Sequence, residues 1–419
     1  MTFSAEAVRP HFPSLNRPIN DAGRLPIFLD NPAGTQVPQA VIDAVGEYYR
    51  TMNANSGGAF PTSQRSDAMM EGVRQRAADF LNAARPEEIV FGQNMTTLNF
   101  ALAHALARTL KPGDEIVLTH MDHDANVAPW LHIAQDHGLT VRWVNVRTDD
   151  CTLDMDSLEA AITEHTKIVA AVHASNAVGT INPVQQIADI AHAAGALFVM
   201  DAVQSAPHVP IDVQAIGCDF LLCSAYKFFG PHIGLMYGRY ELLASLPVYK
   251  VRPSKDAPPH RWETGTLSFE TIHAVGAALD YLAQIGAQYG TGDFPGFSGR
   301  RLQLKQAMHA LTEYERALVG HLIAGLQSLP GVSVAGITDP ARFGERVPTV
   351  VFVMEGFTPD EIQAKLGEQH IYVWSGNYYA VEIMEALGHS EHGMLRVGLA
   401  HYNTRAEVDQ FLAALRGLR

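Results

Sequence analysis

The sequence predicts an α/β protein with a mostly parallel, doubly wound sheet in a large domain and a small C-terminal α+β domain. Two features of the chain predict this architecture. Between about residues 88 and 238, short apolar runs alternate with amphipathic helical patterns, which is typical of a parallel sheet covered by helices on both faces. After residue 300 the alternation gives way to one long helical pattern, short apolar strands and two further helices.

The chain is predicted to begin with an irregular arm and then to become helical. Prolines at positions 10, 13, 18 and 26 break residues 1–26 into short pieces. A short apolar piece and a turn-rich loop follow over 27–38, and a helix over 41–49 comes next. A loop of glycine and small polar residues over 53–63 is long enough to have a function, and a helix runs from 66 to about 84.

The alternating series begins with a strand at 88–91 that leads directly into a helix. Leucines and alanines recur at helical spacing from Leu98 to Leu106, and Thr96 or Thr97 is a candidate N-cap. Such a helix start offers backbone N–H groups to an anion, although ordinary threonine capping is the alternative interpretation. Further strands are predicted at 115–120, 140–146, 167–175, 196–202, 219–225 and 232–238, with helices from about 128, over 156–164 and over 184–194.

The C-terminal part is predicted to form a separate unit. A Gly-Thr turn and a helix occupy 262–282, and the turn-rich stretch 290–300 marks a domain boundary. A helix over 303–329, strands at 349–354, 371–376 and 394–400, and a helix from 360 follow, and Thr404 and Glu407 form a capping box for the last helix. We therefore predict an arm at 1–26 that packs on the small domain, a large domain at 27–289 and a small domain at 290–419.

Composition excludes several classes of partner. No window approaches 18 uninterrupted apolar residues, so no membrane span is expected. The net charge of -14 disfavours a nucleic-acid partner. The three cysteines, Cys151, Cys218 and Cys223, form no CxxC pair, so neither a metal site nor a disulfide framework is predicted. The N-terminus lacks a signal-peptide pattern, and a cytoplasmic location is expected.

Two polar residues at strand ends predict a specific cofactor. Lys227 follows the apolar strand 219–225, where desolvation frees an amine as a nucleophile, although a surface lysine in a turn is the alternative interpretation. Asp201 ends the preceding apolar strand, where a carboxylate is costly unless it meets a cation or donors. Consecutive parallel strands bring both side chains to one sheet edge. Pyridoxal phosphate requires this pair, a lysine for its aldehyde and an acid for its ring nitrogen.

The sequence around these residues resembles fold type I pyridoxal-phosphate enzymes of the class V aminotransferase group, close to the SufS-like cysteine desulfurases. The resemblance covers nearly the whole chain and is seen in HMDHDANVAPW, HASNAVGTINPV, FVMDAVQSAPH, CSAYK, ETGT and MLRVGLAHYNT. It implies a homodimer and an amino acid as the small-molecule substrate. It assigns the cofactor to Met95, Thr96, Thr97, His123 (stacked on the ring), Asn176, Asp201, Gln204, Ser224, Tyr226, Lys227 and, from the partner subunit, Thr266. It assigns the substrate carboxylate to Arg396, with Asn377 and Tyr378 beside it.

The departures from the family pattern bear on the reaction. Met95 stands where the phosphate loop usually has a threonine, and Tyr226 stands where a histidine usually precedes the lysine. Desulfurases carry a nucleophilic cysteine in a stretch resembling RTGHHCA, whereas this chain has WSGNYYA at 374–380. Tyr379 replaces the cysteine and Trp374 replaces an arginine. A phenol forms no stable persulfide, and the three cysteines present are interpreted as inert structural residues.

The sequence therefore predicts a β-elimination lyase that acts on a carbon–sulfur bond, or a desulfurase-like activity without a persulfide cysteine. In this hypothesis Lys227 removes the Cα proton, Asp201 and His123 support the ring, and Tyr379 or Tyr378 protonates the leaving group. Two alternatives remain open at this point. One is an aminotransferase or epimerase that uses the same Cα chemistry, and the other is a non-catalytic binding protein with the same fold.

Overall fold

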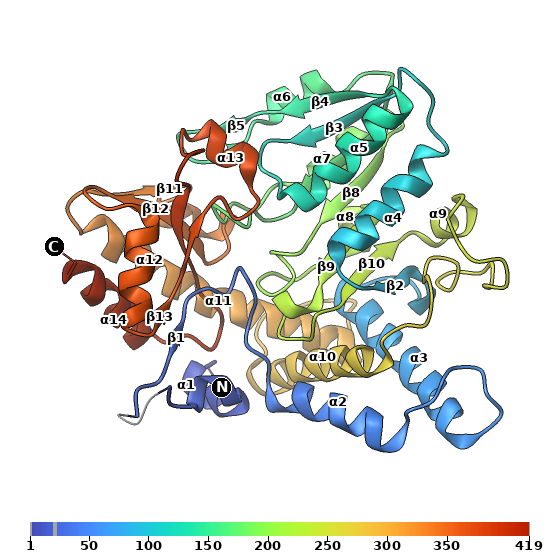
Figure 1. Cartoon of the computed structure of the whole chain (residues 1–419), viewed down its shortest axis with the longest axis horizontal. Helices are drawn as coiled ribbons and strands as arrows, with labels where there is room; N and C mark the ends of the chain where they lie inside the picture. Colours follow the sequence, from blue (N-terminus) through green and yellow to red (C-terminus); the bar gives the residue numbers. More distant parts are fainter. Residues whose placement is uncertain (1, 20–22, 419) are drawn as a thin grey trace.

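The computed structural model describes residues 2–19 and 23–418, and its largest element is a sheet of seven strands (Figure 1). The strand order is β2-β10-β9-β8-β7-β3-β4. Only β10 runs antiparallel to its neighbours, so the sheet is mostly parallel. The strands are β2 (Ile89–Gly92), β3 (Glu115–Thr119), β4 (Thr140–Val144), β7 (Thr166–Val172), β8 (Leu197–Asp201), β9 (Phe220–Ser224) and β10 (Gly234–Gly238).

Both faces of this sheet are buried under helices. In β9, Leu221 and Cys223 belong to one hydrophobic core, while Phe220 and Leu222 belong to the core on the opposite face. The first core is completed by α3 (Pro61–Leu81), α6 (Met155–Ala161), α7 (Val184–Ala193) and α10 (Phe269–Tyr289). The second is completed by α4 (Met95–Ala107), α5 (Ala128–His137) and α9 (Tyr240–Ser245), while α2 (Gln39–Thr51) packs on α10. The central strands β8 and β9 are almost continuously apolar because helices cover both faces of the sheet there, whereas the edge strand β4 is partly exposed and contains Arg142.

The C-terminal part forms a second unit with its own core. Its antiparallel sheet has the order β11-β12-β15-β14. The strands are β11 (Val332–Ala335), β12 (Thr349–Met354), β14 (Trp374–Gly376) and β15 (Met394–Gly398), and the helices are α11 (Gly299–Gln327), α12 (Pro359–Glu368), α13 (Val381–Ala386) and α14 (Arg405–Arg416). Phe352 and Phe411 are fully buried between sheet and helices. The predicted fold class is confirmed.

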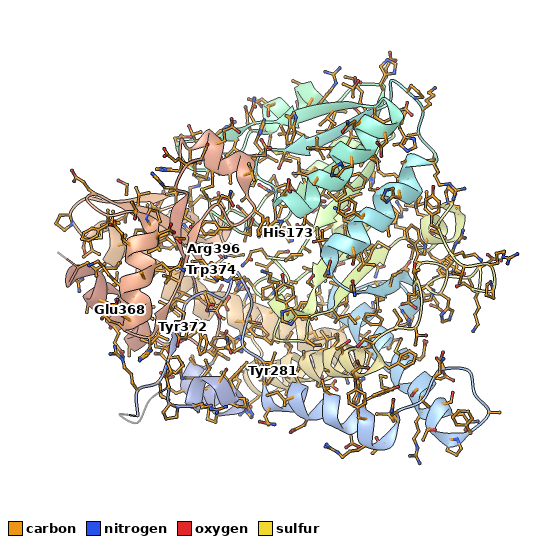
Figure 2. All side chains as sticks on the ribbon, in the orientation of Figure 1. His173, Tyr281, Glu368, Tyr372, Trp374 and Arg396 are labelled. Atoms are coloured by element: carbon orange, nitrogen blue, oxygen red, sulfur yellow. The ribbon has the colours of Figure 1, made fainter. Side chains whose placement is uncertain are left out.

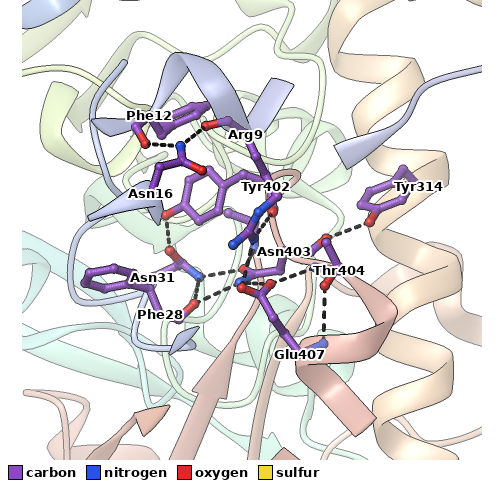
Figure 3. Close-up of polar contacts among 11 residues, drawn as sticks. Arg9, Phe12, Asn16, Phe28, Asn31, Tyr314, Tyr402, Asn403, Thr404 and Glu407 are labelled. Atoms are coloured by element: carbon purple, nitrogen blue, oxygen red, sulfur yellow. Dashed lines mark hydrogen bonds and ion pairs between the residues drawn. The ribbon is translucent and has the colours of Figure 1, made fainter. Parts of the chain in front are cut away.

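The N-terminal arm contacts both units and is more regular than its prolines indicate. It contains α1 (Ala5–Val8) and two short 3-10 turns, Arg9–His11 and Pro13–Asn16, because proline is tolerated at the start of a helical turn. Arg9 Nη1 lies 2.8 Å from Glu407 Oε1, and the Phe12 ring packs at 4.8 Å from that of Tyr402 (Figure 3). β1 (Ile27–Phe28) then pairs with β13 (Ile371–Tyr372).

Several local predictions were wrong for identifiable reasons. Asn94, not Thr96 or Thr97, caps α4, because its side chain accepts the N–H of Thr97 at 2.9 Å. The helix predicted from residue 66 begins at Pro61, a favourable first position. The stretch 371–376 divides between two sheets. The elements not predicted include β11, α8 (Val213–Ile216), α9, α13 and the hairpin β5 (Val146–Arg147)–β6 (Thr152–Leu153). The domain limits predicted from sequence, after residues 26 and 289, remain predictions. Within the described residues, no helix is long and apolar enough to cross a membrane.

Candidate active site

The carboxyl ends of the central strands open into a cavity of about 1300 Å³ between the large sheet and the C-terminal unit. Every residue assigned to the site from sequence lines this cavity except Thr266. The residues brought together are Met95, Thr96, Thr97, His123, Asn176, Asp201, Gln204, Ser224, Tyr226, Lys227, Asn377, Tyr378, Tyr379 and Arg396. Thr266 is exposed and lies outside this lining in the single chain.

Lys227 ends the short 3-10 turn that follows β9 and reaches across to the N-terminal segment. Its Nζ donates to the carbonyl oxygens of Pro32 and Ala33, the latter at 3.0 Å. Burial, and secondly the nearby Arg396 charge, lower the pKa of Lys227 to about 7. A substantial fraction of this amine is therefore neutral near neutral pH, which is the form that attacks an aldehyde.

Asp201 is the last residue of β8 and lies next to the strand that leads to Lys227. The two strands pair in parallel with Asp201 opposite Leu222, so both chain ends point to the same sheet edge. The carboxyl group is 2% exposed, and its Oδ1 accepts the N–H of Val203 at 2.8 Å. Burial raises the pKa of Asp201 to about 6, while that hydrogen bond and the Lys227 charge act against the shift. A cation placed in the cavity beside Asp201 would stabilise its ionised form.

His123 stands at the end of the loop after β3 and carries an uncharged ring. The N–H of Ala125 donates to His123 Nδ1 at 3.0 Å, and burial lowers the pKa of His123 to about 4. The ring stacks on Tyr379, with centroids 5.5 Å apart and planes at 28°. The preceding Asp122 is fully buried and accepts from Thr119 Oγ1 and Asn126 Nδ2, so it anchors this loop.

The first turn of α4 forms one wall of the cavity. The N–H of Met95 donates to Ser224 Oγ at 2.9 Å, which leaves the Ser224 hydroxyl hydrogen available to an acceptor in the cavity. Helix starts favour anions, and α4 presents Met95, Thr96 and Thr97 here. Tyr226 lies opposite, half-buried, with its ring stacked on that of His232 at 4.7 Å.

Arg396 projects from β15 and is 5% exposed. Its Nη1 donates to the carbonyl oxygen of Asn176 at 2.9 Å, and its guanidinium carbon lies 4.2 Å from the centre of the Tyr378 ring. Its Nε has no hydrogen-bond partner among the described residues. Burial lowers the pKa of Arg396 to about 10, so it stays charged at neutral pH and offers part of its fork to an anion.

Two orphaned amide oxygens indicate that the cavity is built for a polar ligand. Asn176 Oδ1 and Gln204 Oε1 are buried without a hydrogen-bond partner among the described residues, and both residues line the cavity. Buried polar atoms without partners are costly, and the O and N positions of an amide are assigned from its hydrogen bonds. A ligand with polar ring substituents would satisfy them, which fits pyridoxal phosphate between Lys227, Asp201 and the start of α4.

None of the three cysteines, all of which lie in the described part of the chain, lines the cavity. Cys151, Cys218 and Cys223 are each at most 1% exposed. Burial raises the pKa of Cys151 to about 11, and it also raises the pKa values of the other two thiols. These thiols are therefore protonated and inaccessible near neutral pH.

Sequence reasoning missed three residues near the site. Burial raises the pKa of Asp30 to about 6, while the charges of Arg396 and Lys227 act against this shift. Asp30 Oδ1 has no hydrogen-bond partner among the described residues. Asp122 precedes the predicted His123, and its position at a strand's carboxyl end was the available signal. His232, which stacks on Tyr226, lies beyond the Gly-Pro turn and had no local signal. Asp30 approaches the site only through the pairing of the N-terminal segment with the C-terminal unit.

Comparison with known proteins supplies the family. The sequence matches the aminotransferase class-V family over residues 27–292 and 290–411. It is 34% identical over 426 residues to a probable cysteine desulfurase of Synechocystis sp., covering 98% of this chain and 95% of the relative. It is 35% identical over 423 residues to an aminotransferase-like protein of Gibberella zeae, covering 99% of this chain and 98% of the relative. The apo structure of a cysteine desulfurase from Thermococcus onnurineus NA1 is similar with a TM-score of 0.87 and 29% identity, covering 100% of this chain and 99% of that chain.

The fold and these matches define a pyridoxal-phosphate-dependent enzyme of fold type I. The chain belongs to the class V aminotransferase family, with cysteine desulfurases among its relatives. The predicted family, cofactor and enzyme class are confirmed. The roles of the individual residues stay predictions.

Proposed function

We propose that this chain is a pyridoxal-phosphate-dependent carbon–sulfur lyase that acts on a cysteine-like amino acid by β-elimination. One observation carries this choice over a persulfide-forming desulfurase. The cavity contains a lysine, a buried aspartate and an arginine, whereas no cysteine lines it and all three thiols are buried elsewhere. Tyr379, at the position where the family resemblance expects the nucleophilic cysteine, has an oxygen that cannot carry sulfur away as a stable persulfide.

The residues proposed to hold the cofactor fall into four groups, by the part of the cofactor that they face. The start of α4, Ser224 and Tyr226 face the phosphate, and Thr266 contributes from the partner subunit of a homodimer. Asp201 faces the ring nitrogen, His123 stacks on the ring, and Asn176 and Gln204 face the ring oxygen. When bound, the cofactor withdraws electrons from the α carbon of an amino acid. The exposed position of Thr266 supports its use by a second subunit.

The chain's own groups then act on the substrate. The free Nε of Arg396 and its fork bind the α-carboxylate, with Tyr378 packed behind and Asn377 nearby. Lys227, with a pKa of about 7, is poised to accept the Cα proton. Of the two candidate acids for the leaving group, Tyr379 is favoured, since the Tyr378 hydroxyl already donates to the carbonyl of Met394.

The overall reaction balances without an oxidant or a thiol acceptor. The Cβ–S bond breaks, the sulfur leaves as a thiol with a proton, and one water converts the remainder to pyruvate and ammonium. A desulfurase would instead form alanine and transfer sulfur to a protein cysteine. The unpaired thiols fit a reducing compartment, which supports the cytoplasm as the location.

Product analysis tests the proposal. Incubated with L-cysteine, the purified holoenzyme is expected to release pyruvate, ammonium and sulfide in equal amounts. This activity should persist in single Cys151→Ala, Cys218→Ala and Cys223→Ala variants and after treatment with iodoacetamide. Tyr379→Phe should lower turnover by about 100-fold if its hydroxyl is the acid. Alanine as the product, with loss of activity in one cysteine variant that retains its fold and cofactor absorbance, would show a desulfurase.

Formation of the pyridoxamine form of the cofactor, or Cα deuterium exchange without pyruvate, would instead support the aminotransferase or epimerase alternative. A purified protein without cofactor absorbance would support the non-catalytic alternative.

A further inference from the structure

Two aromatic side chains that are unusually exposed lie on the rim of the same cavity. Tyr379 is 70% exposed and Trp374 is 46% exposed, and both belong to the cavity lining. Large apolar surface left in water is costly unless a ligand or partner covers it. Resting on the proposed function, we propose that the substrate is a cysteine thioether with an apolar, ring-sized group on sulfur, which Trp374 and Tyr379 bind.

The strand register places Trp374 beside the residue proposed to hold the substrate. Trp374 pairs directly with Arg396 across the antiparallel strands β14 and β15. Directly opposed residues project from the same face of a sheet, about 5 Å apart at Cβ. Figure 2 shows both side chains where the C-terminal unit faces the large sheet. A substrate whose carboxylate meets Arg396 therefore has the Trp374 ring within reach of its side chain.

Both rings are attached to backbone that is held in place. Ser375, next to Trp374, donates its N–H and its hydroxyl to Gln363 Oε1 on α12, each at 2.6 Å. The Tyr379 carbonyl accepts the N–H of Asp124 at 2.7 Å, and its ring stacks on His123. Tyr378 and Tyr379 have φ values of 56° and 57°, a left-handed conformation rarely adopted by aromatic residues. The backbone that carries Trp374 and Tyr379 is therefore held in place before a ligand arrives.

The charges of the cavity disfavour an anionic group on sulfur. Among the described lining residues, Lys227 and Arg396 are the basic side chains apart from histidines, and both have a role in the proposed reaction. No lysine or arginine of the lining remains to pair with an anionic substituent, and the lining includes the carboxylate of Asp124. An anionic group would lose its hydration without a compensating ion pair.

The size of the cavity also admits such a substrate. A volume of about 1300 Å³ exceeds the roughly 300–1,000 Å³ typical of a site for one small ligand. It therefore has room for the cofactor together with a substrate larger than cysteine.

The first test compares four substrates that differ only in the group on sulfur, namely S-benzyl-, S-methyl-, S-carboxymethyl- and S-(2-aminoethyl)-L-cysteine. We expect kcat/KM for pyruvate release from the benzyl compound to exceed each of the others by at least about tenfold, since ring burial against aromatic side chains supplies that factor. In Trp374→Ala the benzyl-to-methyl ratio should fall toward one. In Tyr249→Ala, which removes a 69% exposed aromatic ring outside the cavity lining, the ratio should stay unchanged.

A second test measures binding without turnover. The compound 3-(benzylthio)propionate has the carboxylate, sulfur and ring but no amine, so it cannot react. Of the four tryptophans, Trp130 and Trp262 are 0% and 6% exposed, and Trp143 is stacked on His120 outside the cavity lining. Trp374 is therefore expected to dominate quenching of tryptophan fluorescence by this compound. Trp374→Phe should remove most of the quenching yet keep the binding, seen as a thermal shift, and 3-(methylthio)propionate should bind at least about tenfold more weakly.

The outcomes separate the two proposals. Pyruvate release without a benzyl preference, or with a preference for a charged substituent, would overturn the ring-binding proposal while the lyase stands. Ring-dependent binding at Trp374 without pyruvate release from any of the four compounds would refute the lyase while the ring-binding site stands. Absence of pyruvate release and of ring-dependent binding would overturn both the lyase proposal and the ring-binding proposal.

Discussion

Lys227 allows a quantitative prediction because its surroundings set the fraction of neutral amine. Burial, followed by the guanidinium of Arg396, lowers the pKa of Lys227 to about 7, while Asp201 and Asp30 oppose the shift. With that pKa, about one tenth of the amine is neutral at pH 6, about one half at pH 7 and about nine tenths at pH 8. A solvated lysine with a pKa of about 10.4 instead gains neutral amine about tenfold for each pH unit over the whole range.

The assay uses enzyme freed of cofactor, pyridoxal as the aldehyde and borohydride to trap the product. Peptide mass spectrometry then measures modification at Lys227 and, in the same digest, at the exposed Lys255 as an internal reference. We expect modification of Lys227 to rise about tenfold from pH 6 to pH 8 and then to level off.

A variant tests the electrostatic part of this reasoning. Arg396→Gln removes the neighbouring positive charge and so stabilises the ammonium form of Lys227. The midpoint of the curve of Lys227 modification against pH should therefore move to higher pH. If modification of Lys227 in the unaltered protein keeps rising through pH 9 without a plateau, the amine is not desolvated and the reasoning is refuted.

Three further predictions concern catalysis and stability. Asp201→Asn should lower turnover by on the order of 100-fold or more while cofactor absorbance persists, and full turnover would remove Asp201 from the mechanism. Glu263→Gln should destabilise the fold by about 3–5 kcal/mol in urea unfolding, because it leaves the buried guanidinium of Arg74, now 2.7 Å from Glu263, without a charge partner. Glu382→Gln, in a partly exposed pair with a histidine, should change stability by less than about 1 kcal/mol as the control, and equal effects would contradict the burial argument. Phe352→Ala should cost about 3–5 kcal/mol, since its ring is fully buried in the core of the C-terminal unit, and a calorimetric transition unchanged in temperature would exclude that role.

Most of the large domain could be predicted from sequence because its signals are local. Continuous apolar runs separated by helical periodicity identify buried parallel strands, and β8 and β9 were found in this way. Lys227 and Asp201 follow or end these consecutive strands, so the topology of a parallel sheet brings them to one edge. Capping chemistry is equally local, and the capping box of Thr404 and Glu407 is present as predicted.

Element boundaries were less predictable where two local signals competed. Asn94 and Thr97 both suit a helix start, and the structure uses them together, with Asn94 as the cap and Thr97 returning a hydrogen bond to its backbone. The apolar stretch 371–376 resembled one strand, but its two ends pair with different sheets. Which neighbour a short strand meets depends on burial elsewhere in the chain.

The sequence by itself determined the residue types and their order, namely an amine and an acid at neighbouring strand ends, an arginine in the C-terminal part and no cysteine at position 379. Tertiary structure alone decided that Pro32 and Ala33 accept from Lys227, that Trp374 stands opposite Arg396, and that none of the three cysteines, all of them in the described part of the chain, lines the cavity. The physical reason is the range of the forces involved. Hydrogen-bond propensity and hydrophobic periodicity act over a few residues, whereas pairing between distant segments follows from which surfaces the whole chain buries together.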